Sequence, residues 1–251
     1  MPLTDQVALI TGASRGIGRA IALRLAREHP RHIVVGYSMN HQAARQTVDD
    51  LTAMGVSASA ISTDVGKSEL MREMFDEVRR RCGRLDIFVS NAARTSFRPA
   101  MELTIRDWQR IMDMNARAFL LGSQMAAELM HPGGGRIVGI SSLGSRYSVP
   151  GYAGLGAAKA VVETLTRYLA VELAPRGINV NVVCGGFIDT ESMRLAPDYK
   201  ELTKSILKRT AARRLGRPED LAGIVAFLCS PDSDWIRGQT LIADGGFSIL
   251  P

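Results

Sequence analysis

Short apolar runs and longer amphipathic stretches alternate along the whole chain. Between the runs, apolar residues recur at helical spacing, as at Ile17, Ile21 and Leu25. Runs without polar alternation are typical of strands buried on both faces of a sheet. The pattern therefore predicts a parallel sheet with helices on both sides. The predicted strands are Val7–Ile10, Ile33–Gly36, Ala58–Ile61, Leu85–Val89, Arg136–Ile140, Ile178–Val183 and Thr240–Ala243.

The alternation continues through all 251 residues without a repeat, a low-complexity tract or a linker. Such a length is ample to bury one large core. We therefore expect a single domain over residues 1–251.

A glycine-rich loop, Thr11–Gly18, follows the first predicted strand and opens the first helix. Glycines at this point let the backbone turn sharply and approach a pyrophosphate, which then lies at the positive end of the helix. A tight turn would explain the glycines alone, but their place between a strand and a helix favours dinucleotide binding. The expected fold is thus α/β, a single-domain Rossmann-type doubly wound sheet of about seven parallel strands. The loop residues expected at the cofactor are Gly12, Ser14, Arg15, Gly16, Ile17 and Gly18.

The end of the second strand indicates which dinucleotide binds. NAD-binding sheets place an acidic residue there to hold the ribose hydroxyls, whereas NADP-binding sheets accommodate a phosphate. No Asp or Glu occurs from His29 to Val48, and the strand ends near Ser38 and Asn40. Arg15 is either a surface arginine or a charge-assisted partner for a 2′-phosphate. Together these features predict NADPH as the cofactor.

The distribution of charge along the chain indicates which kinds of partner are expected. Between Glu191 and Arg217 lie eight basic and three acidic residues, which account for +5 of the net charge of +6. This segment is either a solvated helix face or a docking surface for an acidic partner. Nucleic acid is not expected, because Tyr199 is the segment's only aromatic residue and no nucleic-acid-binding motif accompanies it.

No run of apolar residues is long enough to span a membrane, and residues 1–6 lack the features of a signal peptide. The three cysteines and four histidines show no metal-ligand or disulfide spacing. We therefore expect a cytoplasmic protein without a metal site.

Several motifs make the chain resemble the short-chain dehydrogenase/reductase family over nearly its whole length. Besides Thr11–Gly18, they are Asp64-Val65, Ser90-Asn91-Ala92-Ala93, Asn115, Ile140-Ser141-Ser142, Lys159 and Asp244-Gly245-Gly246. The resemblance implies that Asp64 contacts the adenine, Asn91 the adenosine side, and Asn115 a water chain behind Lys159. It also implies that Val65, Ala92, Ala93, Gly185, Gly186, Ile188 and Thr190 contact the cofactor.

The chain departs from the family's Tyr-x3-Lys signature, because Leu155 stands four residues before Lys159. The nearest tyrosine is Tyr152, which gives Tyr-x6-Lys. Seven residues rotate an α-helix by about 700°, within about 20° of two full turns, so Tyr152 should face the same side as Lys159. The attachment point of the tyrosine moves about 4.5 Å along the helix axis.

This displacement suggests a different substrate. In ketone reduction, the oxygen that needs the proton is bonded to the carbon that receives hydride. In reduction of an α,β-unsaturated thioester, negative charge collects on a carbonyl oxygen two bonds further away, where a stabilising donor must lie. The resemblance agrees, because Tyr-x6-Lys is the pattern of enoyl-acyl-carrier-protein reductases. The chain is most similar to the NADPH-dependent type III enzymes among them.

We therefore predict an NADPH-dependent enoyl-thioester reductase. Tyr152 donates a hydrogen bond to the enolate oxygen, and Lys159 holds the nicotinamide ribose and lowers the pKa of the tyrosine. Ser142 orients the substrate or assists Tyr152, for which Tyr147 is a rival. The alternatives are a ketone or aldehyde reductase of the same family and a redox-silent NADP-binding regulator.

The prediction extends to partners. Residues 190–217 would form a lid over the substrate and a landing surface for an acidic acyl carrier protein, which would carry the acyl thioester. Two long helices, Leu103–Met130 and Tyr152–Glu172, are those through which the family usually forms tetramers, so the resemblance implies a homotetramer.

Overall fold

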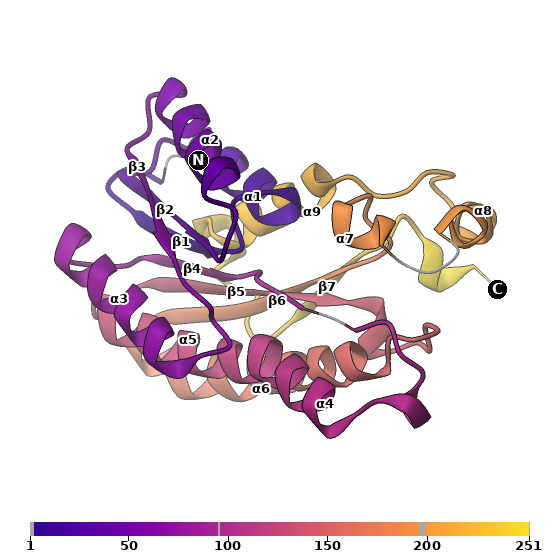
Figure 1. Ribbon diagram of the computed structural model, residues 1–251. Helices are drawn as coiled ribbons and strands as arrows, with labels where there is room; N and C mark the ends of the chain where they lie inside the picture. Colours follow the sequence, from indigo (N-terminus) through magenta and orange to yellow (C-terminus); the bar gives the residue numbers. More distant parts are fainter. Residues whose placement is uncertain (1–2, 95, 196–198, 251) are drawn as a thin grey trace.

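Seven strands form one parallel sheet in the order β3-β2-β1-β4-β5-β6-β7 (Figure 1). The computed structural model describes residues 3–94, 96–195 and 199–250. The strands are β1 (Val7–Thr11), β2 (His32–Tyr37), β3 (Ala58–Ser62), β4 (Ile87–Ser90), β5 (Gly135–Ser142), β6 (Ile178–Gly185) and β7 (Thr240–Ala243). All seven predicted strands are present, and the predicted doubly wound α/β fold is confirmed.

Helices cover both faces of the sheet. One face carries α1 (Gly16–Ala26), α2 (His41–Ala53) and α9 (Pro218–Leu228), and the other carries α3 (Ser68–Cys82), α5 (Ala118–Leu129) and α6 (Ala153–Leu173) (Figure 1). None of the helices in the described part of the chain combines the length and apolar character needed to cross a bilayer.

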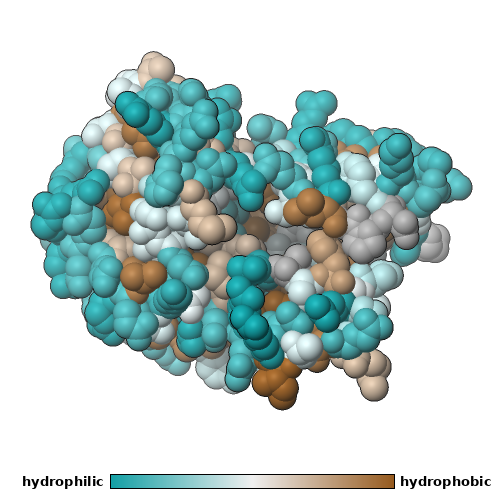
Figure 2. All heavy atoms as spheres, viewed as in Figure 1, coloured by the Kyte–Doolittle hydropathy of each residue, from teal (hydrophilic) through white to brown (hydrophobic). Residues whose placement is uncertain are grey.

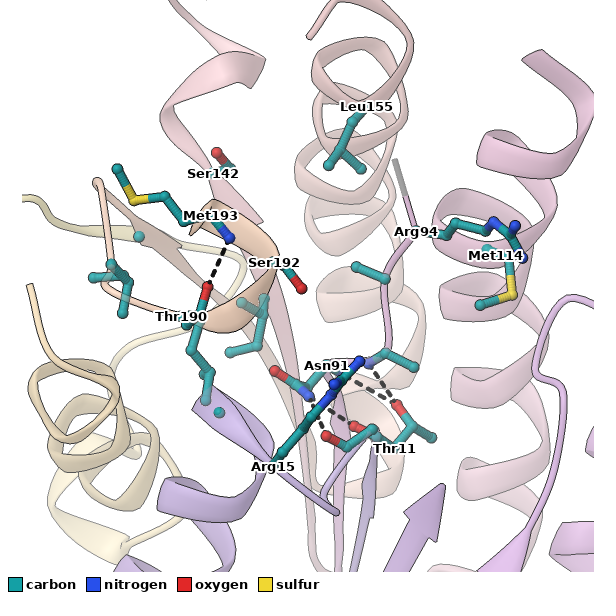
Figure 3. A pocket seen from close by; sticks show the side chains of 18 of the residues that line it. Thr11, Arg15, Asn91, Arg94, Met114, Ser142, Leu155, Thr190, Ser192 and Met193 are labelled. Carbon is teal, nitrogen blue, oxygen red and sulfur yellow. Dashed lines mark hydrogen bonds between the residues drawn. The ribbon is translucent and has the colours of Figure 1, made fainter. Parts of the chain in front are cut away.

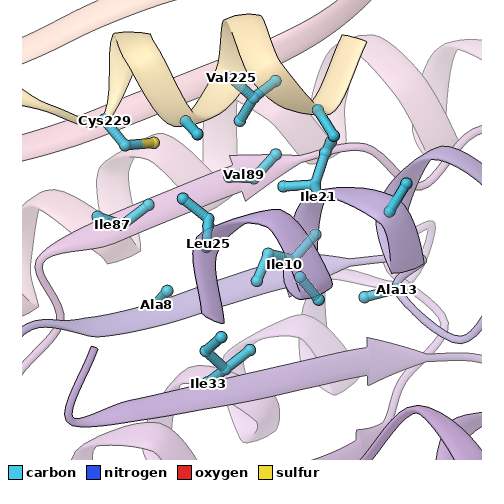
Figure 4. Packing of buried hydrophobic residues seen from close by; sticks show 14 of the residues in the cluster. Ala8, Ile10, Ala13, Ile21, Leu25, Ile33, Ile87, Val89, Val225 and Cys229 are labelled. Carbon is cyan, nitrogen blue, oxygen red and sulfur yellow. The ribbon is translucent and has the colours of Figure 1, made fainter. Parts of the chain in front are cut away.

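The alternation of side chains along each strand divides the core in two. On β1, Ala8 and Ile10 pack into the cluster under α1 and α9, whereas Val7 and Leu9 point into the opposite cluster. Figure 4 shows the first cluster, in which Ile21 of α1 lies close to Ile10. Both faces are apolar, which is why the strands lack the polar alternation of a half-exposed sheet.

The long helix predicted over Leu103–Met130 is not continuous. The structure forms α4 (Ile105–Met112), a π-helical segment (Asp113–Arg117) and then α5. In the π segment, the side-chain amide of Asn115 donates to the carbonyl oxygens of Ile111 at 2.8 Å and Arg94 at 3.1 Å. Single π-helical turns of this kind often occur at functional sites.

The strand order reverses direction between β1 and β4, which defines the switch point of the sheet. Ligands of open α/β sheets bind beyond the carboxyl ends of the strands at such a point. The short helices α7 (Glu191–Arg194) and α8 (Tyr199–Arg209) follow β6 on this side. The sheet therefore directs the loops that carry the predicted site residues to one edge.

Candidate active site

A cavity of about 510 Å³ lies at the carboxyl ends of the strands. Figure 2 shows the surface hollowed in this region. Of the residues predicted to act in catalysis or to bind cofactor, Gly18, Asp64 and Asn115 are the ones that do not line the cavity. The others do: Gly12, Ser14, Arg15, Gly16, Ile17, Ser38, Asn40, Val65, Asn91, Ala92, Ala93, Ser142, Tyr152, Lys159, Gly185, Gly186, Ile188 and Thr190.

The glycine loop is held against the end of β4. The side-chain amide of Asn91 donates to the carbonyl oxygens of Thr11 at 2.9 Å and Gly12 at 3.2 Å, and the Thr11 hydroxyl accepts from two backbone amides of the β4 loop (Figure 3). Gly12 has a φ of +67°, and a Cβ there would lie 3.0 Å from the Cα of Ala92. Glycine at this position therefore lets the loop pack closely on the end of β4, and the loop lines the cavity at the N-terminus of α1, where a pyrophosphate would be favoured.

Gly18 acts behind the loop rather than at its surface. A Cβ at this position would lie 2.3 Å from the carbonyl oxygen of Gly12. Its role is therefore to let α1 pack closely on the loop, which brings the helix N-terminus to the cavity.

The region expected to distinguish NADP from NAD presents polar groups without a carboxylate from β2. Ser38 and Asn40 line the cavity, although the Asn40 side chain accepts from the backbone N–H of Ala43 and so caps α2. Arg15 is exposed and forms an ion pair with Glu191, across the cavity on α7. Asp64 does not line the cavity, and its side chain accepts from the backbone N–H of Gly66.

Ser142, Tyr152 and Lys159 converge on one wall of the cavity. The Tyr152 hydroxyl donates to the Ser142 Oγ at 3.3 Å, and the Lys159 Nζ donates to the carbonyl oxygen of Ile140 at 2.7 Å. Tyr152 is the N-cap residue of α6 and lies just outside the helix, with φ −107° and ψ 4°. Only its carbonyl oxygen takes part in the helix, by accepting from the Gly156 N–H at 2.8 Å, so the helical rotation expected from the spacing does not set the direction of its side chain.

Leu155 occupies the position where the family signature has tyrosine. It is buried in the first turn of α6 and lines the cavity (Figure 3). Tyr147, the rival acid, does not line the cavity; its hydroxyl donates to the carbonyl oxygen of Ser248 at 3.4 Å. Tyr152 is therefore the tyrosine that the fold presents to this wall.

Burial sets the proton affinities at this wall. Desolvation lowers the pKa of Lys159 from 10.5 to about 8. Desolvation raises the pKa of the Tyr152 phenol, and the hydrogen bond with Ser142 acts in the opposite direction. The pKa of Tyr152 is therefore raised, contrary to the lowering expected from Lys159, because burial of the phenol outweighs the opposing effect. Burial also raises the pKa of the Cys184 thiol to about 12, so this cysteine stays protonated and unreactive at neutral pH.

Apolar side chains extend the cavity beyond the catalytic wall. Sequence analysis did not predict Phe97, Val149, Met193 or Leu202 at the site, yet all four line the cavity. Phe97 and Val149 lie on loops, whereas Met193 lies on α7 and Leu202 on α8. Their contribution is an apolar wall beside Tyr152 and Leu155.

Sequence analysis also missed a buried carboxylate. Glu163, one turn beyond Lys159 on α6, accepts from the hydroxyls of Ser141 and Ser145 and from Arg146. The spacing of Lys159 and Glu163 on one helix face was the only signal in the sequence.

The lid segment, residues 190–217, carries fewer unpaired charges than its composition suggests. Residues 196–198, which include Asp198, lie outside the described residues. Arg194 pairs with Asp189 at 2.9 Å and Arg214 with Asp220 at 2.6 Å. Both acidic residues lie just outside Glu191–Arg217. Over residues 189–220 the chain has eight basic and six acidic residues. The basic excess is thus partly neutralised within the fold.

Comparisons with known proteins cover nearly the whole chain. A family model described as enoyl-(acyl carrier protein) reductase matches residues 12–248. A 1-cyclohexenylcarbonyl-CoA reductase from Streptomyces collinus is 46% identical over 98% of this chain and 88% of its own length. Human dehydrogenase/reductase SDR family member 4 is 38% identical over the same shares.

Solved structures agree. A short-chain dehydrogenase from Burkholderia cenocepacia in complex with NADP superposes with a TM-score of 0.92, 35% identity, and coverage of 99% of this chain and 100% of that one. The reductase LugOII, which catalyses keto-reduction in lugdunomycin biosynthesis, gives a TM-score of 0.90 and 36% identity, covering 98% and 99% of the two chains. The chain belongs to the short-chain dehydrogenase/reductase family. It is an oxidoreductase that depends on a nicotinamide dinucleotide.

Proposed function

We propose that this protein reduces the C=C bond of an enoyl thioester with NADPH. The observation that carries the proposal is the placement of Tyr152 at the N-cap of α6, with Leu155 in the family's tyrosine position. A donor displaced along the helix suits an oxyanion that forms two bonds from the carbon receiving hydride. The cyclohexenylcarbonyl-CoA reductase, at 46% identity, acts on a substrate of this class by its name.

The cofactor supplies the hydride when it is bound. The glycine loop, in which Gly12 and Gly16 line the cavity, fits its pyrophosphate, and Lys159 lies where it can hold the nicotinamide ribose. The Tyr152 hydroxyl stabilises the enolate oxygen and then donates a proton, while Ser142 orients that hydroxyl. Phe97, Val149 and Leu202 form an apolar wall that excludes water from the acyl group.

Relocating the tyrosine tests this assignment. We expect Tyr152→Phe to lower kcat for crotonyl thioester by about 10² to 10⁴, as is typical for loss of a general acid. The double variant Tyr152→Phe/Leu155→Tyr should gain turnover of acetoacetyl thioester. Product identification by mass spectrometry separates butyryl from 3-hydroxybutyryl thioester. If Tyr152→Phe keeps full turnover, Tyr152 is not the donor.

Arg15 and the absence of a carboxylate at the end of β2 support NADPH over NADH. We predict that Arg15→Ala weakens NADPH binding about tenfold, since a hydrogen bond to a charged group contributes about 1.5 kcal/mol or more. NADH binding, measured by the same nicotinamide-fluorescence titration, should change little. An equal loss for both cofactors would assign Arg15 to a shared part of the dinucleotide.

A ketoreductase is the second candidate. The 3.3 Å contact between Tyr152 and Ser142 supports it, because the same pair could polarise a ketone. LugOII, at 36% identity, catalyses a keto-reduction. The two functions differ in the substrate that is turned over, which a direct comparison resolves.

For partners, we propose an acidic acyl carrier protein and a homotetramer. Lys200, Lys204 and Lys208 are exposed and recur every four residues along α8, so they form one basic stripe beside the cavity. Exposed apolar residues on α4 and α6, among them Ile105 and Val171, support contacts between subunits.

A further inference from the structure

Glu163 is a buried carboxylate that the proposed reaction does not use. It lies on α6, four residues after Lys159, and only 6% of the residue is exposed. Its Oε1 accepts from the Ser141 Oγ at 2.7 Å and the Ser145 Oγ at 2.6 Å, and its Oε2 accepts from Arg146 at 3.0 Å. The charge is therefore fully engaged, as a buried carboxylate requires.

All three donors come from the segment around Ser142. Ser141 precedes it in β5, while Ser145 and Arg146 follow it at the 3₁₀ turn Leu143–Ser145. The Ser145 hydroxyl also lies 2.8 Å from the carbonyl oxygen of Ser142, so its single proton is shared between that carbonyl and Glu163. Ser145 thus connects Glu163 directly to the backbone of Ser142.

The same turn is pressed against the start of α6. A Cβ at Gly156 would lie 2.3 Å from the Gly144 carbonyl oxygen, and a Cβ at Gly144 would lie 2.4 Å from the ring of Tyr152. The glycines permit close contact but do not fix the loop along the helix. The directional bonds to Glu163 supply that constraint, because hydrogen bonds fix both distance and angle.

Stability alone is a weak explanation for such a group. A buried charge contributes little net stability compared with apolar residues of similar size, because its desolvation offsets its bonds. A fully satisfied polar network instead holds a segment in one conformation. Here the segment carries the hydroxyl that Tyr152 contacts.

We propose that Glu163 is a positioning residue, which acts through Ser145 to keep the Ser142 hydroxyl within hydrogen-bond distance of Tyr152. The inference rests on the proposed function, in which Tyr152 stabilises the oxyanion. It assigns the network a role in the chemical step and none in cofactor binding, because the Glu163 carboxylate does not line the cavity.

Ser145→Ala and Ser141→Ala form a matched pair that tests the proposal. Each removes one hydroxyl that donates to the same oxygen of Glu163, but only Ser145 also contacts the Ser142 carbonyl. We expect similar losses in melting temperature. With crotonyl thioester and NADPH, kcat should fall about tenfold for Ser145→Ala and less than twofold for Ser141→Ala. The Kd for NADPH should stay unchanged in both.

Glu163→Gln and Glu163→Leu complete the test. Gln keeps an acceptor oxygen for both serines and should retain most of kcat, whereas Leu should show the Ser145→Ala loss. Equal kcat for the two serine variants overturns the positioning role, even if Glu163→Leu fails to fold. Full turnover by Tyr152→Phe would instead overturn the proposed function, so the two failures are distinguishable.

Discussion

Lys159 is a buried lysine, although its charged amine is better solvated in water. The side chain is buried near the end of β5, where it donates to the Ile140 carbonyl oxygen, and desolvation lowers its pKa to about 8. Folding therefore disfavours the charged form, and this penalty is fully present below the folded-state pKa. It is relieved as the pH rises from about 8 toward the unfolded value of 10.5. Burial of this cation in the wall of the cavity therefore lowers the stability of the fold at neutral pH.

We predict that Lys159→Met stabilises the fold at pH 7 while it abolishes turnover. The relieved desolvation is worth about 3 kcal/mol and the lost hydrogen bond about 1 kcal/mol, so the net gain is about 2 kcal/mol. Urea unfolding at pH 7 and at pH 10.5 measures this change in the free energy of unfolding. The gain should disappear at the higher pH, where the wild-type amine is largely neutral. A gain that does not change with pH would contradict the burial of a charge.

At the residue scale, the sequence predicted which side chains gather but not how each is used. Ser142, Tyr152 and Lys159 were identified from their motifs, and the structure brings them to one wall. The side-chain amide of Asn91, which is expected at the adenosine side, also donates to two carbonyl oxygens of the glycine loop. Glu163 was missed because its partners depend on how the turn after β5 folds back on α6, which no local pattern encodes.

Among the elements, the turn Leu143–Ser145 and the helix α6 determine the geometry of the catalytic wall. Their backbones meet at Gly144 and Gly156 with no room for a methyl group. The approach lets the ring of Tyr152 lie over Gly144 and reach Ser142.

We predict that Gly156→Ala destabilises the protein by about 1–3 kcal/mol, the usual cost of overpacking, and lowers kcat strongly. Gly223→Ala in α9 is the control, since a Cβ there meets nothing within 4 Å and Ala is the better helix former. That variant should be stabilised by up to about 1 kcal/mol with unchanged turnover. If both substitutions behave alike in thermal unfolding and kcat, the close approach does not shape the site.

The strands were predictable as elements because each is buried on both faces and rich in Val and Ile, as β1 and β6 illustrate. The interruption between α4 and α5 was not. The π-helical segment depends on Asn115, whose amide reaches the carbonyl of Arg94 from 21 residues away. Helical periodicity carries no information about such a contact.

For the whole molecule, exposed apolar side chains predict self-association. Ile105 on α4 and Val171 on α6 are each 75% exposed, and Tyr168, three residues before Val171 on α6, is 64% exposed. We expect a tetramer of about 109 kDa from the chain mass of 27.2 kDa. Light scattering after size-exclusion chromatography measures it.

Val171→Lys should shift this species toward dimer or monomer, because it places a charge in an apolar contact. Phe227→Lys, a substitution on the outer side of α9, controls for a general effect of charge. A wild-type monomer at micromolar concentration would contradict the prediction.

The surface charge of residues 189–220 depends on ion pairs that composition alone does not reveal. The count over Glu191–Arg217 indicated a strongly basic surface, but folding pairs Arg194 and Arg214 with acids just outside that range. What the sequence predicted well at this scale was the order of motifs along a doubly wound sheet. The depth and apolar lining of the cavity depended on loops whose packing it did not reveal.

The most direct test is NADPH oxidation by the wild-type protein, followed at 340 nm, with crotonyl and acetoacetyl thioesters side by side. If hydride adds to the β-carbon of an enoyl thioester while Tyr152 stabilises the oxyanion, the protein should turn over the crotonyl thioester. Reduction of the acetoacetyl thioester should be at least about 100-fold slower, a difference of about 2.7 kcal/mol in the activation free energy. Turnover of the acetoacetyl thioester alone would contradict the account and show that Tyr152 serves carbonyl reduction.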